Sequence, residues 1–140
     1  MQHLIERMAK AHPAPESEFG PELGDCYRIT LECSQVCSAC ADACLAEHHV
    51  DPLIHCIRLC LDAADICGTT ARVLSRQTAP DLGIITMMLE VCARTAHACA
   101  DECERHAVDH VHCQICAIAC FACIDACRKL LDAGRPELHH

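Results

Sequence analysis

The spacing of sixteen cysteines constrains the fold of this 140-residue chain more than any other feature of its sequence. Within each of four groups, successive cysteines are three, four or seven positions apart. These separations return repeatedly to one face of an α-helix, as the a and d positions of a bundle helix do. The groups are Cys26, Cys33, Cys37, Cys40 and Cys44; Cys56, Cys60 and Cys67; Cys92, Cys99 and Cys103; and Cys113, Cys116, Cys120, Cys123 and Cys127. The pattern predicts four helices whose thiols all point toward a shared axis.

Long segments with helical periodicity carry these groups, over about residues 21–49, 52–76, 78–108 and 109–133. Asp51 is a possible cap and Pro52 suits the first turn of the second segment, while Gly134 and Pro136 are expected to end the fourth. Strand signals are weak, because the chain lacks Asn-Gly and Asp-Gly turns and alternating β-branched residues. Long helices with short connections pack as antiparallel neighbours. We therefore expect an all-α fold, an antiparallel up-down-up-down four-helix bundle with a short N-terminal helix.

The first twenty residues differ from the rest of the chain. Leu4, Ile5 and Met8 form a short amphipathic pattern that Pro13 and Pro15 end. This predicts two parts: a short N-terminal helix and linker over residues 1–20, and a cysteine-lined four-helix bundle over residues 21–140.

Composition and charge exclude several classes of function. The formal net charge is −9, and no basic stripe is interleaved with aromatic residues, which argues against nucleic-acid binding. No uninterrupted apolar run reaches the ~18 residues of a membrane-spanning helix, so no membrane partner is expected. The N-terminus has no apolar export signal, which predicts a cytoplasmic protein with reduced cysteines.

Reduced thiols on a shared axis point to metal chemistry. Pairs of cysteines at i and i+4 have Cβ atoms ~5–6 Å apart, too far for a disulfide, which needs about 3.8 Å. Thiolates are soft ligands that select Cu(I), Zn(II) or iron–sulfur clusters. Four tetrahedral Zn(II) ions would leave about eight negative charges in a dry interior, whereas one Cu(I) per thiolate leaves it neutral. Charge therefore favours multiple Cu(I) ions per chain.

The repeated Cys-x-x-x-Cys pairs and the dense run from Cys113 to Cys127 resemble the copper storage proteins, over about residues 21–133. These are four-helix bundles that hold many Cu(I) ions inside a tube of cysteines. The resemblance, which is to the cytosolic branch, implies a non-enzymatic role in copper storage or sequestration, copper homeostasis and protection from copper toxicity. It also implies a homotetramer. A copper chaperone or a small-thiol copper donor is a possible partner.

Histidines gather where the first and third long helices end and the second and fourth begin. Six lie there: His48, His49, His55, His106, His110 and His112. Continuing the cysteine register places His106, His110 and His48 inward. We expect this end to admit copper, with His106 and His110 as ligands beside the sixteen cysteines, because neutral imidazole binds copper.

The opposite end carries apolar residues at the extended register positions, predicting a plug: Leu74, Ile85, Met88, Leu130 and Leu131. Met87 and Met88 are soft enough to bind copper, but methionine in a helical stripe is more often core filler. His139 and His140 follow the expected end of the last helix. Two alternatives remain open from the sequence, a general zinc or cadmium buffer and a thiol redox switch.

Overall fold

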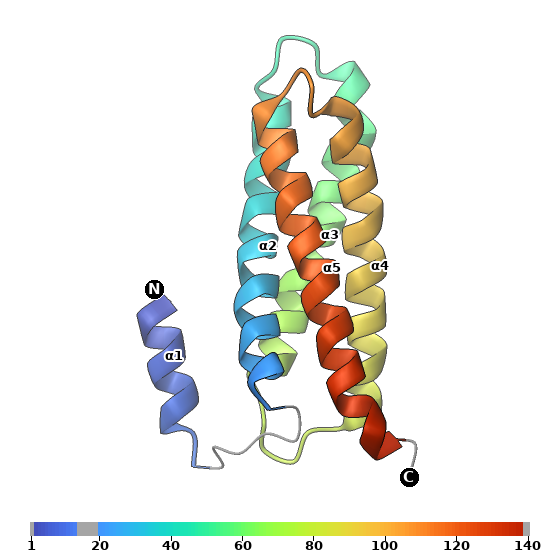
Figure 1. The fold of residues 1–140 in the computed structure, drawn as a ribbon. Helices are drawn as coiled ribbons and strands as arrows, with labels where there is room; N and C mark the ends of the chain where they lie inside the picture. The colour runs from blue at the N-terminus through green and yellow to red at the C-terminus, as the bar shows by residue number, and fades with distance from the viewer. Residues whose placement is uncertain (1, 14–19, 139–140) are drawn as a thin grey trace.

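The computed structural model describes residues 2–13 and 20–138. Its helices are α1 (Gln2–Ala11), α2 (Pro21–Leu45), the 3-10 turn η1 (Asp51–Leu53), α3 (Ile54–Leu74), α4 (Leu82–His106) and α5 (Val111–Leu138). The described residues contain no strand. Figure 1 shows α2, α3, α4 and α5 running alternately up and down, so the predicted all-α, antiparallel four-helix bundle is confirmed. His139 and His140 lie outside the described residues.

The four long helices form a closed square around one axis. Helix α2 packs against α3 and α5, and α4 packs against the same two helices. The connections α2–α3 and α4–α5 lie at one end, which we call the histidine end; the connection α3–α4 lies at the other, which we call the apolar end (Figure 1). Helix α1 stands outside this square, beside the lower part of α2 (Figure 1).

Local sequence explains where two of the helices begin. Gly20 has φ of 66°, a left-handed conformation that glycine adopts without strain, and it turns the chain into Pro21 at the start of α2. Asp81 caps α4, since its carboxylate accepts a hydrogen bond from the Ile84 backbone N–H at 3.0 Å. Pro52 lies in the turn η1 before α3, where no side chain acts as a cap.

Two helix ends differ from the sequence-based expectation. Helix α2 ends at Leu45 rather than near His49, because residues 46–50 cross the end of the bundle to reach α3. Helix α5 continues through Gly134 and Pro136 to Leu138. Proline already has a helical φ and Pro136 lies within the last turn, while glycine costs about 1 kcal/mol. Neither residue is enough to stop the helix.

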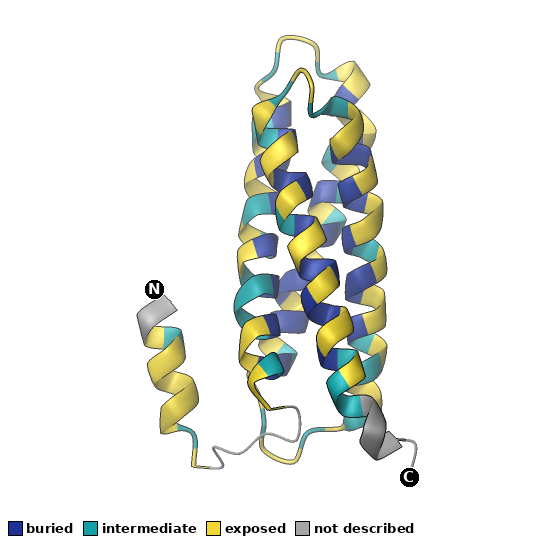
Figure 2. Cartoon of the chain, in the orientation of Figure 1, coloured by how far each residue is buried: buried dark blue, intermediate teal, exposed yellow. Residues whose placement is uncertain are grey.

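The interior of the bundle is built from small side chains. All sixteen cysteines are buried and free, and Figure 2 shows the buried positions along the inner faces of the four helices. Most of the other buried residues between them are alanines: Ala41, Ala63, Ala71, Ala93, Ala96, Ala100, Ala117 and Ala126. The expectation that every thiol points to the bundle axis is confirmed.

Large apolar side chains close the apolar end. Leu74, Ile85 and Leu130 are fully buried there, as the register predicts. Leu23 and Leu89 complete the plug, whereas Met88 and Leu131 are only half-buried. The one-position shift from Met88 to Leu89 follows the helical register of α4, in which Ile85, Leu89 and Cys92 share a face. Met87 is exposed, and it is not on the face of α4 that carries the cysteines.

Helix α4 is the one described helix that is long and apolar enough, by length and composition, to cross a membrane. The mean hydropathy of α4 meets this criterion although the helix contains no uninterrupted apolar run of about 18 residues. A core helix of a soluble bundle meets the same criteria. Its buried face carries Cys92, Cys99 and Cys103 and packs against α3 and α5, so this is weak evidence for a membrane location.

Candidate metal centre

The sixteen thiols form one continuous column along the bundle axis. Most neighbouring sulfur atoms lie 3.6–4.0 Å apart, as between Cys37 and Cys120 at 3.6 Å and between Cys26 and Cys127 at 4.0 Å. Cys40, Cys44 and Cys113 join the column through sets whose ligand atoms lie within 4.8 Å of one another. Contacts link different helices as well as successive turns; Cys92 of α4, for example, contacts Cys67 of α3 and Cys123 of α5 at 3.7 Å each. No thiol in this column is isolated from the others.

Several sets of three or four sulfurs converge closely enough to bind one ion. In each set the candidate ligand atoms lie within 4.8 Å of one another. One set takes a single thiol from each helix of the bundle: Cys40, Cys60, Cys103 and Cys116. Others are Cys37, Cys99, Cys116 and Cys120; Cys33, Cys67 and Cys123; and Cys92, Cys123 and Cys127. Because Cys116 and Cys123 each belong to two sets, bound ions would share bridging sulfurs.

The sulfur separations suit a coordinated metal rather than a disulfide. With metal–sulfur bonds of ~2.3 Å, three- or four-coordinate sites have sulfurs roughly 3.8–4.0 Å apart, and a linear site roughly 4.6 Å. The i,i+4 pairs Cys33–Cys37 and Cys99–Cys103 are separated by 3.8 and 3.9 Å. A disulfide would need about 2.05 Å. Within this structure the thiols are therefore spaced for ligand sets of three or four.

Burial and mutual hydrogen bonding set the protonation of the thiols. Near the histidine end, burial raises the pKa of Cys44 to about 12 and also raises the pKa of Cys113. In the middle of the column, hydrogen bonds from neighbouring thiols, Cys103 foremost, lower the pKa of Cys116 to about 6. The column thus contains thiols that stay protonated at neutral pH and at least one that ionises readily.

His112 is the histidine that joins the thiol column. Its Nδ1 lies 3.4 Å from Cys40 Sγ and 3.6 Å from Cys113 Sγ, and it completes a set with Cys40, Cys44 and Cys113. Desolvation lowers its pKa, but hydrogen bonds with Cys40 and Glu47 outweigh this, and the pKa of His112 is raised. Sequence reasoning placed His112 at this end without choosing it as a ligand. Its position directly before Cys113, in the first turn of α5, is the signal that could have identified it.

His106 and His110 are half-buried at the histidine end and contact carboxylates instead of thiols. His106 Nε2 lies 2.9 Å from Glu102 Oε2, and His110 Nδ1 lies 2.8 Å from Glu47 Oε2. A carboxylate hydrogen-bonded to the ring is typical of histidines that bind metals, because it orients the ring. Their assignment as copper ligands stays a prediction.

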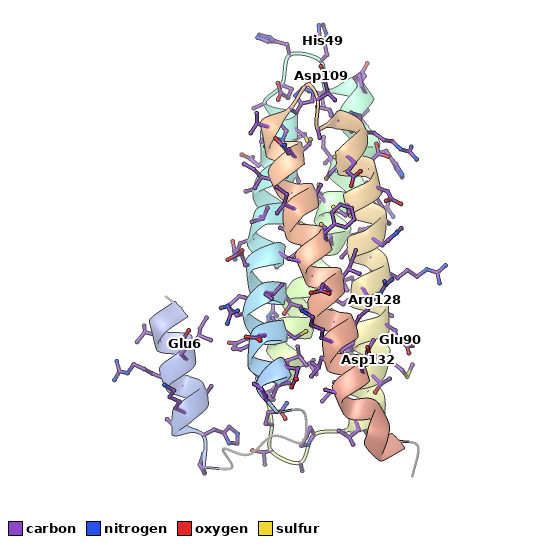
Figure 3. The ribbon with its side chains drawn as sticks, in the orientation of Figure 1. Glu6, His49, Glu90, Asp109, Arg128 and Asp132 are labelled. Atoms are coloured by element: carbon purple, nitrogen blue, oxygen red, sulfur yellow. The ribbon has the colours of Figure 1, made fainter. Side chains whose placement is uncertain are left out.

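Three other histidines at this end are exposed: His48, His49 and His55. The expectation that His48 points inward is wrong, because α2 ends at Leu45 and the cysteine register does not extend beyond it. Figure 3 shows His49 extending away from the bundle.

Buried threonines occupy two inward-facing positions beside the thiol column toward the apolar end. The Thr30 hydroxyl donates to the Cys26 backbone oxygen at 2.8 Å, and the Thr70 hydroxyl donates to the Ile66 oxygen at 2.7 Å. Both hydroxyls are thus satisfied by their own helices.

Proteins of known structure share this arrangement. The copper storage protein Ccsp of Streptomyces lividans, solved loaded with 10 copper equivalents, is 41% identical with a TM-score of 0.85, covering 92% of this chain and 98% of that chain. Copper storage protein 3 of Bacillus subtilis, in its apo form, is 33% identical with a TM-score of 0.65, covering 77% of this chain and 97% of that chain.

Sequence comparisons agree with the structural ones. The uncharacterized cysteine-rich protein YhjQ of Bacillus subtilis (strain 168) is 37% identical over 94 residues, which cover 67% of this chain and 82% of that protein. The sequence model of the family described as copper storage protein matches residues 21–132, a span that contains all sixteen cysteines. The chain therefore belongs to the copper storage protein family.

Proposed function

We propose that this protein stores several Cu(I) ions on the thiolates of its bundle interior. The observation that carries the proposal is the continuous column of sixteen buried, free thiols, in which most neighbouring sulfurs lie 3.6–4.0 Å apart. The related Ccsp of Streptomyces lividans has been solved with 10 copper equivalents, and also with five coppers as a cytosolic copper storage protein. A protein with one metal site would not need a column of this length.

The choice of metal rests on charge. The interior holds no basic side chain that could neutralise a thiolate, since its buried polar residues among those described are Thr30, Thr70 and Glu102. An uncompensated charge in such an interior is very unfavourable. A Cu(I) ion bound for each thiolate formed leaves the column neutral, whereas Zn(II) held by four thiolates leaves two negative charges at each ion.

We assign the copper ligands to the sixteen cysteines, with His106, His110 and His112 serving at the histidine end. The protein would act in the cytoplasm as a homotetramer, without catalysis, and would receive copper from a chaperone or a small-thiol donor. The exposed apolar residues Val111, Ile115 and Ile118 repeat on one face of α5 and support contact between copies. Light scattering in solution tests the tetramer.

Anaerobic titration with Cu(I), followed by metal analysis after gel filtration, tests the storage function. We expect binding to continue to about one ion per thiol, roughly sixteen per chain, because neutrality favours that ratio. An end point of one or two ions per chain would contradict storage.

A zinc buffer is the second candidate, since sulfurs 3.6–4.0 Å apart also suit tetrahedral Zn(II). Loading with equal concentrations of free Zn(II) and Cu(I) separates the two functions. We expect copper to fill the column and zinc to be excluded. Zinc remaining in most sites would favour the buffer.

Copper uptake should depend on pH because it displaces protons from thiols. Burial raises the pKa of Cys44 and Cys113, so these thiols carry protons at neutral pH that copper must remove. Their copper affinity should therefore fall about tenfold for each pH unit of acidification per proton displaced. Chelator competition between pH 6 and pH 8 measures this slope. A slope of zero would show that the thiols are already ionised when copper arrives.

A further inference from the structure

The two connections at the histidine end are joined by one carboxylate. Glu47 lies just beyond α2, yet its Oε2 is 2.8 Å from His110 Nδ1 and 2.8 Å from His112 Nε2. These histidines belong to the α4–α5 connection and the first turn of α5. The side chain of Glu47 is 31% exposed, and those of His110 and His112 are 22% and 25% exposed. The three groups thus form a partly sheltered cluster above the thiol column.

The acceptor character of a carboxylate decides which ring nitrogens carry hydrogen. The carboxylate of Glu47 only accepts hydrogen bonds, and one of its oxygens lies 2.8 Å from a ring nitrogen of each histidine. His112 must therefore donate from Nε2, and His110 must donate from Nδ1. In a neutral ring, the other nitrogen then carries a lone pair.

That lone pair of His112 faces the thiols. His112 Nδ1 lies 3.4 Å from Cys40 Sγ and 3.6 Å from Cys113 Sγ, so in the neutral ring it is oriented to bind an ion held by those sulfurs. If the hydrogen were on Nδ1 instead, His112 would present a donor to the site and could not ligate copper. The tautomer decides whether this group of ligands is complete.

We propose that Glu47 is a positioning residue for copper uptake, which fixes the Nε2–H tautomer of His112 and aims its Nδ1 at Cys40 and Cys113. The inference rests on the proposed storage function, although the tautomer itself is a property of the copper-free protein. By the same contact, Glu47 selects the Nδ1–H tautomer of His110 and leaves His110 Nε2 with the lone pair.

Nitrogen NMR of the copper-free chain, labelled with ¹⁵N-histidine, tests the tautomer directly. At a pH where the rings are neutral, we expect His112 to carry hydrogen on Nε2 in the wild type and to become a mixture of tautomers in Glu47→Ala. A wild-type ring protonated on Nδ1 would overturn the proposal. This measurement needs no copper, so its outcome is independent of whether the protein stores metal.

Copper binding by Glu47→Ala and Glu47→Gln provides the second readout. We expect the affinity of the site at the histidine end to fall about 10- to 100-fold in Glu47→Ala, as is typical when a carboxylate behind a metal-binding histidine is lost. Glu47→Gln should lose less, because its amide oxygen still accepts one hydrogen bond. The total number of ions per chain should change by about one at most, since the cysteines below remain.

Glu104→Gln is the matched control, because it removes one negative charge from an exposed side chain at the same end of the bundle. It should leave both the His112 tautomer and the copper affinity unchanged. Equal losses in Glu104→Gln and Glu47→Ala would show a general attraction of cations and would overturn the positioning role. If wild type binds only one or two ions while the tautomer is as expected, the storage function is contradicted. The orientation of His112 by Glu47 is then still supported.

Discussion

Loading with Cu(I) is expected to raise the midpoint of thermal unfolding by about 30 °C or more. Each site filled at a thousandfold excess of ligand over its Kd contributes about 4 kcal/mol to the free energy of unfolding. Three such sites contribute about 12 kcal/mol, as much as the whole stability of an ordinary domain. For a chain of this size the midpoint rises by about 3 °C per kcal/mol of added stability, so about 12 kcal/mol corresponds to a shift of about 30 °C or more. An ion bound by a set drawn from several helices would cross-link those helices. One such set is Cys40, Cys60, Cys103 and Cys116.

Anaerobic circular dichroism of the reduced apo protein and of the copper-loaded protein measures this shift. Removing copper with a strong Cu(I) chelator should return the midpoint to the apo value, which separates metal binding from irreversible change. A shift below about 5 °C at full loading would mean that copper binds without stabilising the fold, and would place the ions outside the bundle interior.

The second large effect is expected from Leu130→Ala at the apolar end. Leu130 is completely buried, and large buried side chains are scarce in a core made mostly of cysteine and alanine. Removing it leaves a cavity and should lower the free energy of unfolding of the apo protein by about 2–5 kcal/mol. The midpoint should fall by about 10 °C. Urea unfolding of the reduced, metal-free chain measures the loss.

Met87→Ala is the control for this substitution. Met87 lies in α4 at the same end of the bundle, but it is 67% exposed, so its loss should change stability by less than about 0.5 kcal/mol. Both variants should bind the same amount of copper as wild type, because neither residue belongs to the thiol column. A large loss of copper in Met87→Ala would instead make this methionine a ligand.

The bundle and its thiol column could be predicted from the sequence because periodicity alone determines a helix face. The separations of three, four and seven residues place Cys33, Cys37 and Cys40 on one side of α2 wherever the neighbouring helices lie. Buried alanines such as Ala63 and Ala96 continue the same faces. Periodicity was least informative at the ends of helices, where it placed His48 inward and ended α5 at Gly134.

The contacts between elements depend on tertiary structure. Glu47 is far from His110 and His112 in the chain, and no local pattern connects an acidic residue after one helix to the first turn of another. The sulfur separations of 3.6–4.0 Å likewise depend on how closely the four helices approach one another. Sequence by itself determined the helical class, the inward thiols and their soft-metal chemistry, since helical geometry and thiol chemistry act locally. Only the packed bundle decided which thiols meet and which histidine joins them, because those distances depend on the relative placement of separate helices.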